Sequence, residues 1–147
     1  MTGGLGYIGS HTVVELLKKD FKIIILDNLE TSSMTCLEKL RIISNKPKSV
    51  IFYQYDLSNE NAISEIFKTF SIKSVIHCAS LNSENESLSK PLKFYQNNIC
   101  GTVTLLRLMK KYEVKTFIYS SDANIYGRNS ICKESDGLDP SNPCGQT

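Results

Sequence analysis

The 147-residue chain lacks the patterns typical of membrane, secreted and metal-binding proteins. Its longest aliphatic run, Ile23–Leu26, is far too short to cross a bilayer. The N-terminus is rich in glycine rather than basic and then apolar, so we expect no signal peptide. The five cysteines show no C-x-x-C spacing, which disfavours a disulfide framework or a zinc site. We therefore expect reduced thiols in a cytoplasmic protein.

Strong charge of either sign is also missing. The formal net charge is +2, which is too small to predict a nucleic-acid or anionic-membrane partner. Apolar residues make up 41% of the chain and charged residues 22%, as in ordinary soluble globular proteins. The sequence has no internal repeat, and its length predicts a single domain over residues 1–147.

What the sequence does contain is an alternation of β-branched runs with amphipathic segments. The runs predict strands, and the segments between them predict helices. Alternating strands and helices predict an α/β fold, a doubly wound parallel sheet of the Rossmann type. The predicted strands are Phe21–Asp27, Val50–Tyr55, Ser74–Ala79 and Thr116–Ser121, the predicted helices are Ile8–Lys19, Thr35–Ser44, Asn59–Phe70 and Pro91–Tyr112, and a loop is predicted from Gly127 onwards.

A glycine cluster precedes the first predicted helix. Gly4, Gly6 and Gly9 fit G-x-G-x-x-G, and Gly3, Gly6 and Gly9 fit the looser G-x-x-G-x-x-G. Without a Cβ the backbone can turn tightly and approach a pyrophosphate closely, and the following helix directs free N–H groups at the anion. The pattern alone is also compatible with a plain glycine turn.

Asp27 ends the first predicted strand, and Asp56 directly follows the second. Asp27 follows Gly9 by 18 residues, where a carboxylate can bind a ribose 2′-hydroxyl and repel a 2′-phosphate, which favours NAD over NADP. The alternative role of Asp27 is to cap a turn before Asn28. Asp56 lies at the same edge of the sheet, where it can contact adenine or serve as a turn or N-cap residue.

Several longer stretches carry a family resemblance. The segments TGGLGYIGSHTVVELL, LDNLETSS, SVIHCASLNSENES, FYQNNICGTVTLLRLMKKY, FIYSSDANIYG and SNPCGQT occur in this order. They resemble the N-terminal half of the UDP-glucose 4-epimerases, which are extended short-chain dehydrogenase/reductases, and the fungal members most of all. The resemblance covers nearly the whole chain.

The resemblance implies a function and a cofactor. Members of the family interconvert UDP-galactose and UDP-glucose by transient oxidation at C4 of the sugar, with NAD bound non-covalently. A tyrosine takes the proton of the 4-hydroxyl, a nearby lysine lowers the pKa of that tyrosine, and a serine or threonine hydroxyl bonds the same oxygen. A smaller C-terminal domain binds the uridine diphosphate, and members are often homodimers. A UDP-sugar is thus an expected partner only where such a domain is present.

Carried over to this chain, the resemblance predicts an intact NAD site. It matches three groups of positions: the phosphate turn, the adenosine side and one residue near the nicotinamide half. These are Gly3, Gly6, Tyr7, Ile8 and Gly9; Asp27, Asn28, Asp56 and Leu57; and Asn98.

The catalytic positions depart from the family pattern. Where the family reads S-S-S-A-T-V-Y-G, the third residue here is Asp122, and where it reads N-P-Y-G-x-[ST]-K, the tyrosine position holds Cys144. The lysine would follow Thr147. Cys144 is shorter than tyrosine by a ring, and an ionised Asp122 only accepts hydrogen bonds and repels an anionic base. We therefore expect a catalytically inactive chain.

The glycine cluster starts at the third residue, so the first strand of the expected sheet is largely missing. In the strand order 3-2-1-4-5-6 that strand lies between Phe21–Asp27 and Ser74–Ala79. We expect a truncated or decayed copy without the substrate domain and with marginal stability. The alternative is a non-catalytic NAD-sensing or interaction module. A 4,6-dehydratase is disfavoured, because Ala123 and Asn124 stand where its acidic pair is expected.

Overall fold

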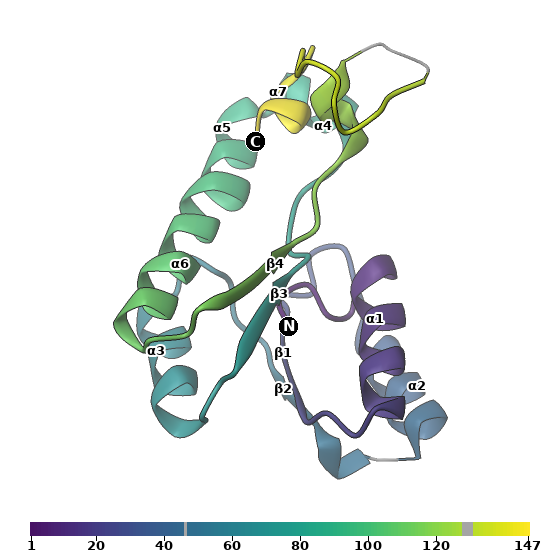
Figure 1. Cartoon of the computed structure of the whole chain (residues 1–147), viewed down its shortest axis with the longest axis vertical. Helices are drawn as coiled ribbons and strands as arrows, with labels where there is room; N and C mark the ends of the chain where they lie inside the picture. Colours follow the sequence, from purple (N-terminus) through teal and green to yellow (C-terminus); the bar gives the residue numbers. More distant parts are fainter. Residues whose placement is uncertain (46, 128–130) are drawn as a thin grey trace.

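Parallel strands form the centre of the molecule, and helices cover them on both sides (Figure 1). The computed structural model describes every residue except 46 and 128–130. The strands are β1 (Ile23–Leu26), β2 (Val50–Tyr53), β3 (Ser74–His77) and β4 (Thr116–Tyr119). The longer helices are α1 (Tyr7–Lys18), α2 (Met34–Ser44), α3 (Glu60–Thr69) and α6 (Gly101–Lys111). The shorter ones are α4 (Glu84–Ser89), α5 (Pro91–Phe94), α7 (Pro143–Gln146), the 3₁₀ turns η1 (Pro47–Ser49) and η3 (Ala123–Tyr126), and the π-helical η2 (Tyr95–Cys100).

The first residues of the chain join the two strand pairs. β1 pairs with β2 and β3 with β4, and Thr2 bridges Leu26 on one side and His77 on the other, both in parallel. Thr2 N–H donates to Ile76 O at 3.0 Å, and Gly3 N–H donates to Leu26 O at 2.9 Å. The predicted strand order, with the residues before the glycine turn between β1 and β3, is therefore confirmed.

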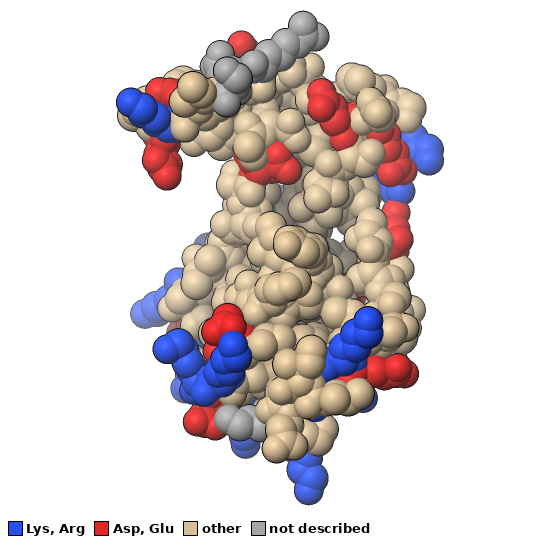
Figure 2. All heavy atoms as spheres, turned by 90° about the vertical axis from the view of Figure 1, so that its right-hand side faces the viewer, with Lys and Arg blue, Asp and Glu red and all other residues tan. Residues whose placement is uncertain are grey.

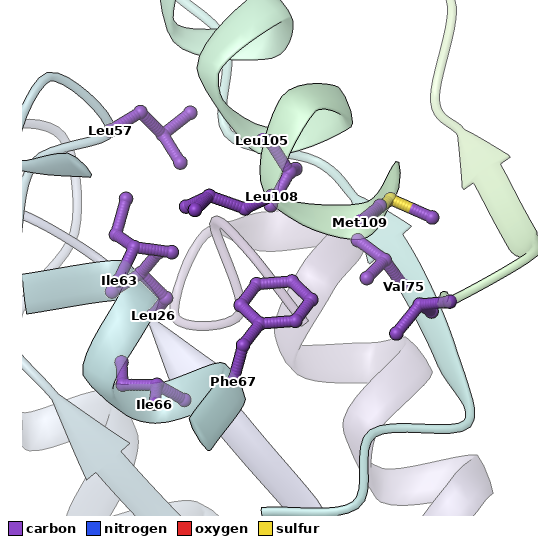
Figure 3. Close-up of a cluster of buried hydrophobic side chains, with 10 residues drawn as sticks. Leu26, Leu57, Ile63, Ile66, Phe67, Val75, Leu105, Leu108 and Met109 are labelled. Atoms are coloured by element: carbon purple, nitrogen blue, oxygen red, sulfur yellow. The ribbon is translucent and has the colours of Figure 1, made fainter. Parts of the chain in front are cut away.

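Side chains that alternate along the central strands fill two cores. Ile23 and Ile25 pack with α1 and α2, whereas Leu26 packs with α3 and α6. Figure 3 shows the second cluster, in which Phe67 of α3 lies against residues of α6 and β3. A parallel sheet with both faces covered requires strands that are apolar on both sides, which explains why these strands appeared as continuous apolar runs.

The predicted helix over Pro91–Tyr112 is one helical rod of three parts, with the π-helical segment between α5 and α6. A π-turn inserts residues without disturbing the apolar spacing on either side of it, so the sequence pattern did not show it. Two further corrections concern short helices. The predicted loop from Gly127 contains α7, and α4 was not predicted; residues 128–130 of that loop lie outside the described residues.

The turn before α1 leaves no space for side chains at two of its glycines. Gly3 has a φ of +64°, and a Cβ there would lie 2.6 Å from Cys78 O. A Cβ on Gly9 would lie 2.1 Å from Gly3 O, because the helix crosses directly over the turn.

His77 is a core residue, as expected from its place in an apolar strand. Its exposed fraction is 2%, Nδ1 lies 2.5 Å from Thr2 Oγ1, and Nε2 lies 2.8 Å from Thr102 Oγ1. The Thr102 hydroxyl donates to Asn98 O, so it accepts from Nε2–H, and Nδ1 accepts from Thr2. Burial, followed by the charge of the Met1 amino group, lowers the pKa of His77 to about 4.

We predict that Gly9→Ala lowers the free energy of unfolding by about 3 kcal/mol, which is roughly 10 °C in the thermal midpoint. The added methyl group collides with Gly3 O, and the turn must open. Gly137→Ala is the matched control, because a Cβ at Gly137 meets no atom within 4 Å. Thermal melts followed by circular dichroism measure both. Equal midpoints for the two variants would contradict the collision.

A second prediction concerns acid stability. Between pH 6.5 and pH 4 the imidazole of His77 takes up a proton in the unfolded chain but not in the folded one. The contribution of the neutral His77 imidazole to the free energy of unfolding is therefore complete above pH 6.5. It is lost as the pH falls, by about 2.5 kcal/mol at pH 4.5. Urea unfolding at pH 7.5 and at pH 4.5 gives the free energy of unfolding that is lost between them. This loss should be smaller by about the same amount in His77→Gln than in the native chain. His11→Gln changes an exposed imidazole and should behave as the native chain does; a native-like loss in His77→Gln would refute the assignment.

Candidate functional site

An open cleft follows the carboxyl ends of the strands and brings most of the predicted site together. It is lined by the glycine turn, by the residues that follow β1 and β2, and by the segment after β3. Figure 2 faces the side covered by α1 and α2 and shows a narrow waist between the two ends of the molecule, with acidic and basic side chains at its right-hand edge. The predicted residues that line the cleft are Gly3, Gly6, Asp27, Asn28, Asp56 and Leu57.

Helix α1 begins at this cleft, and no capping side chain competes with a ligand for its first N–H groups. Its N-cap residue is Gly6, no side chain caps the helix, and its first turn contains no acidic residue. Tyr7 and Ile8 are 84% and 57% exposed at this end. The free N–H groups and the positive end of the helix dipole are thus available to an anion.

Asp27 makes hydrogen bonds to segments on two sides of the cleft. Its Oδ2 accepts from Leu5 N–H at 3.0 Å, while Oδ1 accepts from Leu29 N–H at 3.0 Å and from Ser32 Oγ at 2.7 Å. Asp27 is 8% exposed. It therefore links β1 to the glycine turn and caps the turn after the strand, which is the structural role weighed against ribose binding. Leu29 has a φ of +64°, a strained conformation that this cap supports.

Asp56 and Asn28 connect the ends of β2 and β1. Asn28 Nδ2 donates to Asp56 Oδ2 at 2.8 Å, and Ser58 N–H donates to Asp56 Oδ1 at 2.8 Å. Burial acts to raise the pKa of Asp56, but hydrogen bonds from the Ser58 side chain and backbone, and then from Asn28, outweigh it and hold the pKa below its usual value. Leu57 is buried against α6, where a Cβ on Gly101 would come within 2.9 Å of it.

Asn98, predicted near the nicotinamide half, lies in a second cavity of about 210 Å³ beyond Leu81. Its Oδ1 accepts from Leu81 N–H at 2.9 Å, and its Nδ2 donates to Leu81 O and to Thr147 Oγ1, both at 3.0 Å. It therefore fixes the segment that separates the two cavities. Leu81 and Ser80 line both, so the cleft and the cavity adjoin.

The two altered catalytic positions also line this second cavity. Asp122 is exposed, and its carboxylate accepts from Asn124 N–H at 2.8 Å. Cys144 is 5% exposed and packs with Leu81 and Phe94. Burial, followed by the charge of Asp122, raises the pKa of the Cys144 thiol. The cavity thus disfavours a thiolate.

An ion-paired group beside the cleft was not predicted. Lys93 Nζ of α5 lies 2.6 Å from Glu30 Oε1, which lines the cleft, and 3.0 Å from Glu86 Oε1 of α4. Glu30 lies far in sequence from Glu86 and Lys93, and the three residues fit no motif, so no signal identified them. The hydrogen bond from Lys93, then that from Lys90, lowers the pKa of Glu86.

Over the described residues, no three His, Cys, Asp or Glu side chains come together as a metal site. In the same part of the chain, no helix combines the length and apolar character needed to span a bilayer.

Known proteins are similar to this chain in both fold and sequence. A sequence model described as GDP-mannose 4,6 dehydratase matches residues 1–147. The chain is 45% identical to the UDP-glucose 4-epimerase of Dictyostelium discoideum and 44% identical to that of Bacillus subtilis, each over 100% of this chain and 43% of the relative. The structure of UDP-glucose 4-epimerase from Bifidobacterium longum in complex with NAD+ and UDP superposes with a TM-score of 0.93 at 38% identity, and covers 99% of this chain and 44% of the other.

The chain spans less than half the length of these relatives, and the part that it matches is their N-terminal, Rossmann-type half. It thus belongs to the GDP-mannose 4,6 dehydratase family, and within that family it resembles the UDP-glucose 4-epimerases.

Proposed function

We propose that the chain binds NAD in the cleft at the carboxyl ends of its strands, as the nucleotide-binding half of a UDP-glucose 4-epimerase. The observation that carries this proposal is the uncapped N-terminus of α1, which meets the cleft beside Asp27 without any acidic residue in its first turn. A dinucleotide pyrophosphate is the anion that such a helix start binds in this fold. The NAD+ in the Bifidobacterium longum structure supports the assignment.

The adenosine ribose would lie at Asp27. A carboxylate offers about four lone-pair sites, and the three hydrogen bonds from Leu5, Leu29 and Ser32 leave room for one further hydroxyl. The structural role and the ribose role are therefore compatible. A 2′-phosphate would meet this negative charge in a largely buried position, where repulsion is weakly screened. Asp56 and Leu57 would bound the adenine, and Asn98 the far end of the cofactor.

We further propose that these 147 residues do not catalyse epimerisation. Bound NAD would accept and return a hydride, but a base must reach the 4-hydroxyl proton of the sugar. The Cys144 thiol is buried against Leu81 and Phe94, and both its burial and the Asp122 charge favour the protonated form. Asp122 in its ionised form has no proton to donate to the sugar oxygen. Neither group can replace the hydroxyls of the family pattern.

The proposal also covers the cellular location and the partners of the chain. Cys36, Cys78, Cys100 and Cys144 are free thiols, which supports a reducing, cytoplasmic setting. The small net charge supports neither a nucleic-acid nor a membrane partner. A UDP-sugar is a partner of the longer relatives, and we assign it to this chain only where a uridine-binding part accompanies it.

We predict that the chain binds NADH at least about tenfold more tightly than NADPH, a difference of ~1.4 kcal/mol. The cause is the Asp27 carboxylate, so Asp27→Asn should reduce the ratio of the two dissociation constants towards one. Titration of the nicotinamide fluorescence measures both constants.

Glu15→Gln is the control, because it removes the same charge from the exposed face of α1, where Glu15 pairs with Lys18. It should leave the ratio unchanged. Tighter binding of NADPH to the native chain, or an unchanged ratio in Asp27→Asn with native-like melting, would exclude the role of Asp27.

We also predict no turnover of UDP-galactose above the protein-free control in a coupled assay. Asp122→Ser with Cys144→Tyr should remain inactive, since a phenol ring at position 144 must displace Leu81 or Phe94, at a cost of about 1–3 kcal/mol. Clear activity in the native chain would overturn the proposal.

Alkylation tests the state of the thiol independently of turnover. At pH 7.5, iodoacetamide should modify the exposed Cys100 well before Cys144, as read by peptide mass spectrometry. Faster labelling of Cys144 would show that its thiolate is accessible and available as a base.

A further inference from the structure

An ion pair joins two sides of the cleft at the carboxyl ends of the strands. One side carries the turn after β1, which holds Asp27 and Glu30, and the other carries the segment after β3, which leads into α4 and α5. Lys93 Nζ of α5 lies 2.6 Å from Glu30 Oε1. Since Glu30 itself lines the cleft, a cation stands one contact away from the turn that contains Asp27.

Hydrogen bonds within the turn place the Glu30 backbone close to that of Asp27. Leu29 N–H donates to Asp27 Oδ1, and Glu30 N–H donates to Asn28 Oδ1, both at 3.0 Å. The side chains of Lys93 and Glu30 are 38% and 37% exposed, against 64% and 66% for the surface pair of Lys18 and Glu15. Water and salt therefore screen the charges of Lys93 and Glu30 less than those of an ordinary surface pair.

The charges around Lys93 cancel one another. Lys93 Nζ also lies 3.0 Å from Glu86 Oε1, and Lys90 Nζ lies 3.4 Å from the same oxygen. The hydrogen bond to Glu30, followed by that to Glu86, raises the pKa of Lys93, so its ammonium group stays charged at neutral pH. The group thus contains two carboxylates and two ammonium ions. Loss of the Glu30 charge alone would leave one surplus positive charge at the edge of the cleft.

A 2′-phosphate on the adenosine ribose is the group that distinguishes NADPH from NADH. It carries nearly two negative charges at neutral pH, and sites of this fold that accept it hold a cation near the acidic residue after the second strand of the unit. A lysine ammonium can bind a phosphate as a point charge. In this chain the nearby cation is Lys93, and Glu30 neutralises it.

We propose that the ion pair of Glu30 and Lys93 is a second determinant of cofactor choice, one that excludes a 2′-phosphate from the ribose edge of the cleft. This inference rests on the proposed NAD site and adds to the role of Asp27. Glu30 brings a second negative charge to the turn that receives the ribose, and it engages the cation that a 2′-phosphate requires. In Glu30→Gln the Lys93 ammonium is available to the phosphate.

The test compares the dissociation constants of NADH and NADPH, measured on the whole chain by nicotinamide fluorescence. Glu30→Gln should tighten NADPH binding by about fivefold or more and leave NADH binding within about twofold of the native value. Lys93→Met, added to Glu30→Gln, should return NADPH binding to within about twofold of the native value, because the surplus charge is gone. The gain in Glu30→Gln should also shrink in about 0.5 M NaCl, which screens the attraction.

Glu60→Gln is the matched control. Glu60 Oε1 pairs with Arg107 at 3.3 Å between α3 and α6, and neither residue lines the cleft. This variant makes the same change of charge and should leave both dissociation constants unchanged.

The outcomes separate this inference from the proposed function. If Glu30→Gln melts as the native chain does and binds NADH, but binds NADPH no more tightly, the ion pair has no role in cofactor choice and the NAD site stands. An equal gain with and without Lys93→Met, or the same gain in Glu60→Gln, would also overturn the inference. Absence of NADH binding to the native chain would instead refute the proposed function, and this inference with it.

Discussion

The fold depends on the pairing of three residues, Met1–Gly3, with strands on both sides. Through Thr2 and Gly3 the β1–β2 pair and the β3–β4 pair become one sheet, and the same residues begin the glycine turn. The contacts that fix Thr2 therefore also determine the position of α1 and the direction of its free N–H groups. The His77 contact belongs to this arrangement, because its neutral ring accepts from Thr2 and donates to Thr102 of α6.

The sequence was most informative where burial acts on both faces of an element. The strand run around Ile25 is apolar at every position because helices cover both sides of the sheet, and such runs in alternation with helical segments made the strands, their order and the Rossmann class predictable. Short elements with local caps were missed. Helix α7 is capped by Asn142, whose side chain accepts from Gly145 N–H, and such a four-residue helix leaves no periodic pattern.

Site residues were predictable as a set but less so in their roles. Asp27, Asp56 and the glycines were predicted from their positions at strand ends, and the topology brings those positions into one cleft. The contacts of Asn98 depend on a π-turn and on the fold of the last residues, which no spacing rule shows. The ion pair of Lys93 with Glu30 joins segments that only the tertiary structure brings together.

The contrast between the intact turn and the altered catalytic positions has a steric explanation. Gly3 and Gly9 are required by the fold itself, since a Cβ on either would collide with backbone whether or not a cofactor is present. Positions 122 and 144 are under no such constraint: an exposed aspartate caps a 3₁₀ turn, and a small thiol packs with Leu81 and Phe94. Retained glycines are therefore weaker support for NAD binding than the uncapped start of α1. That start leaves N–H groups unpaired within the helix at the edge of the cleft, where a bound anion can accept from them.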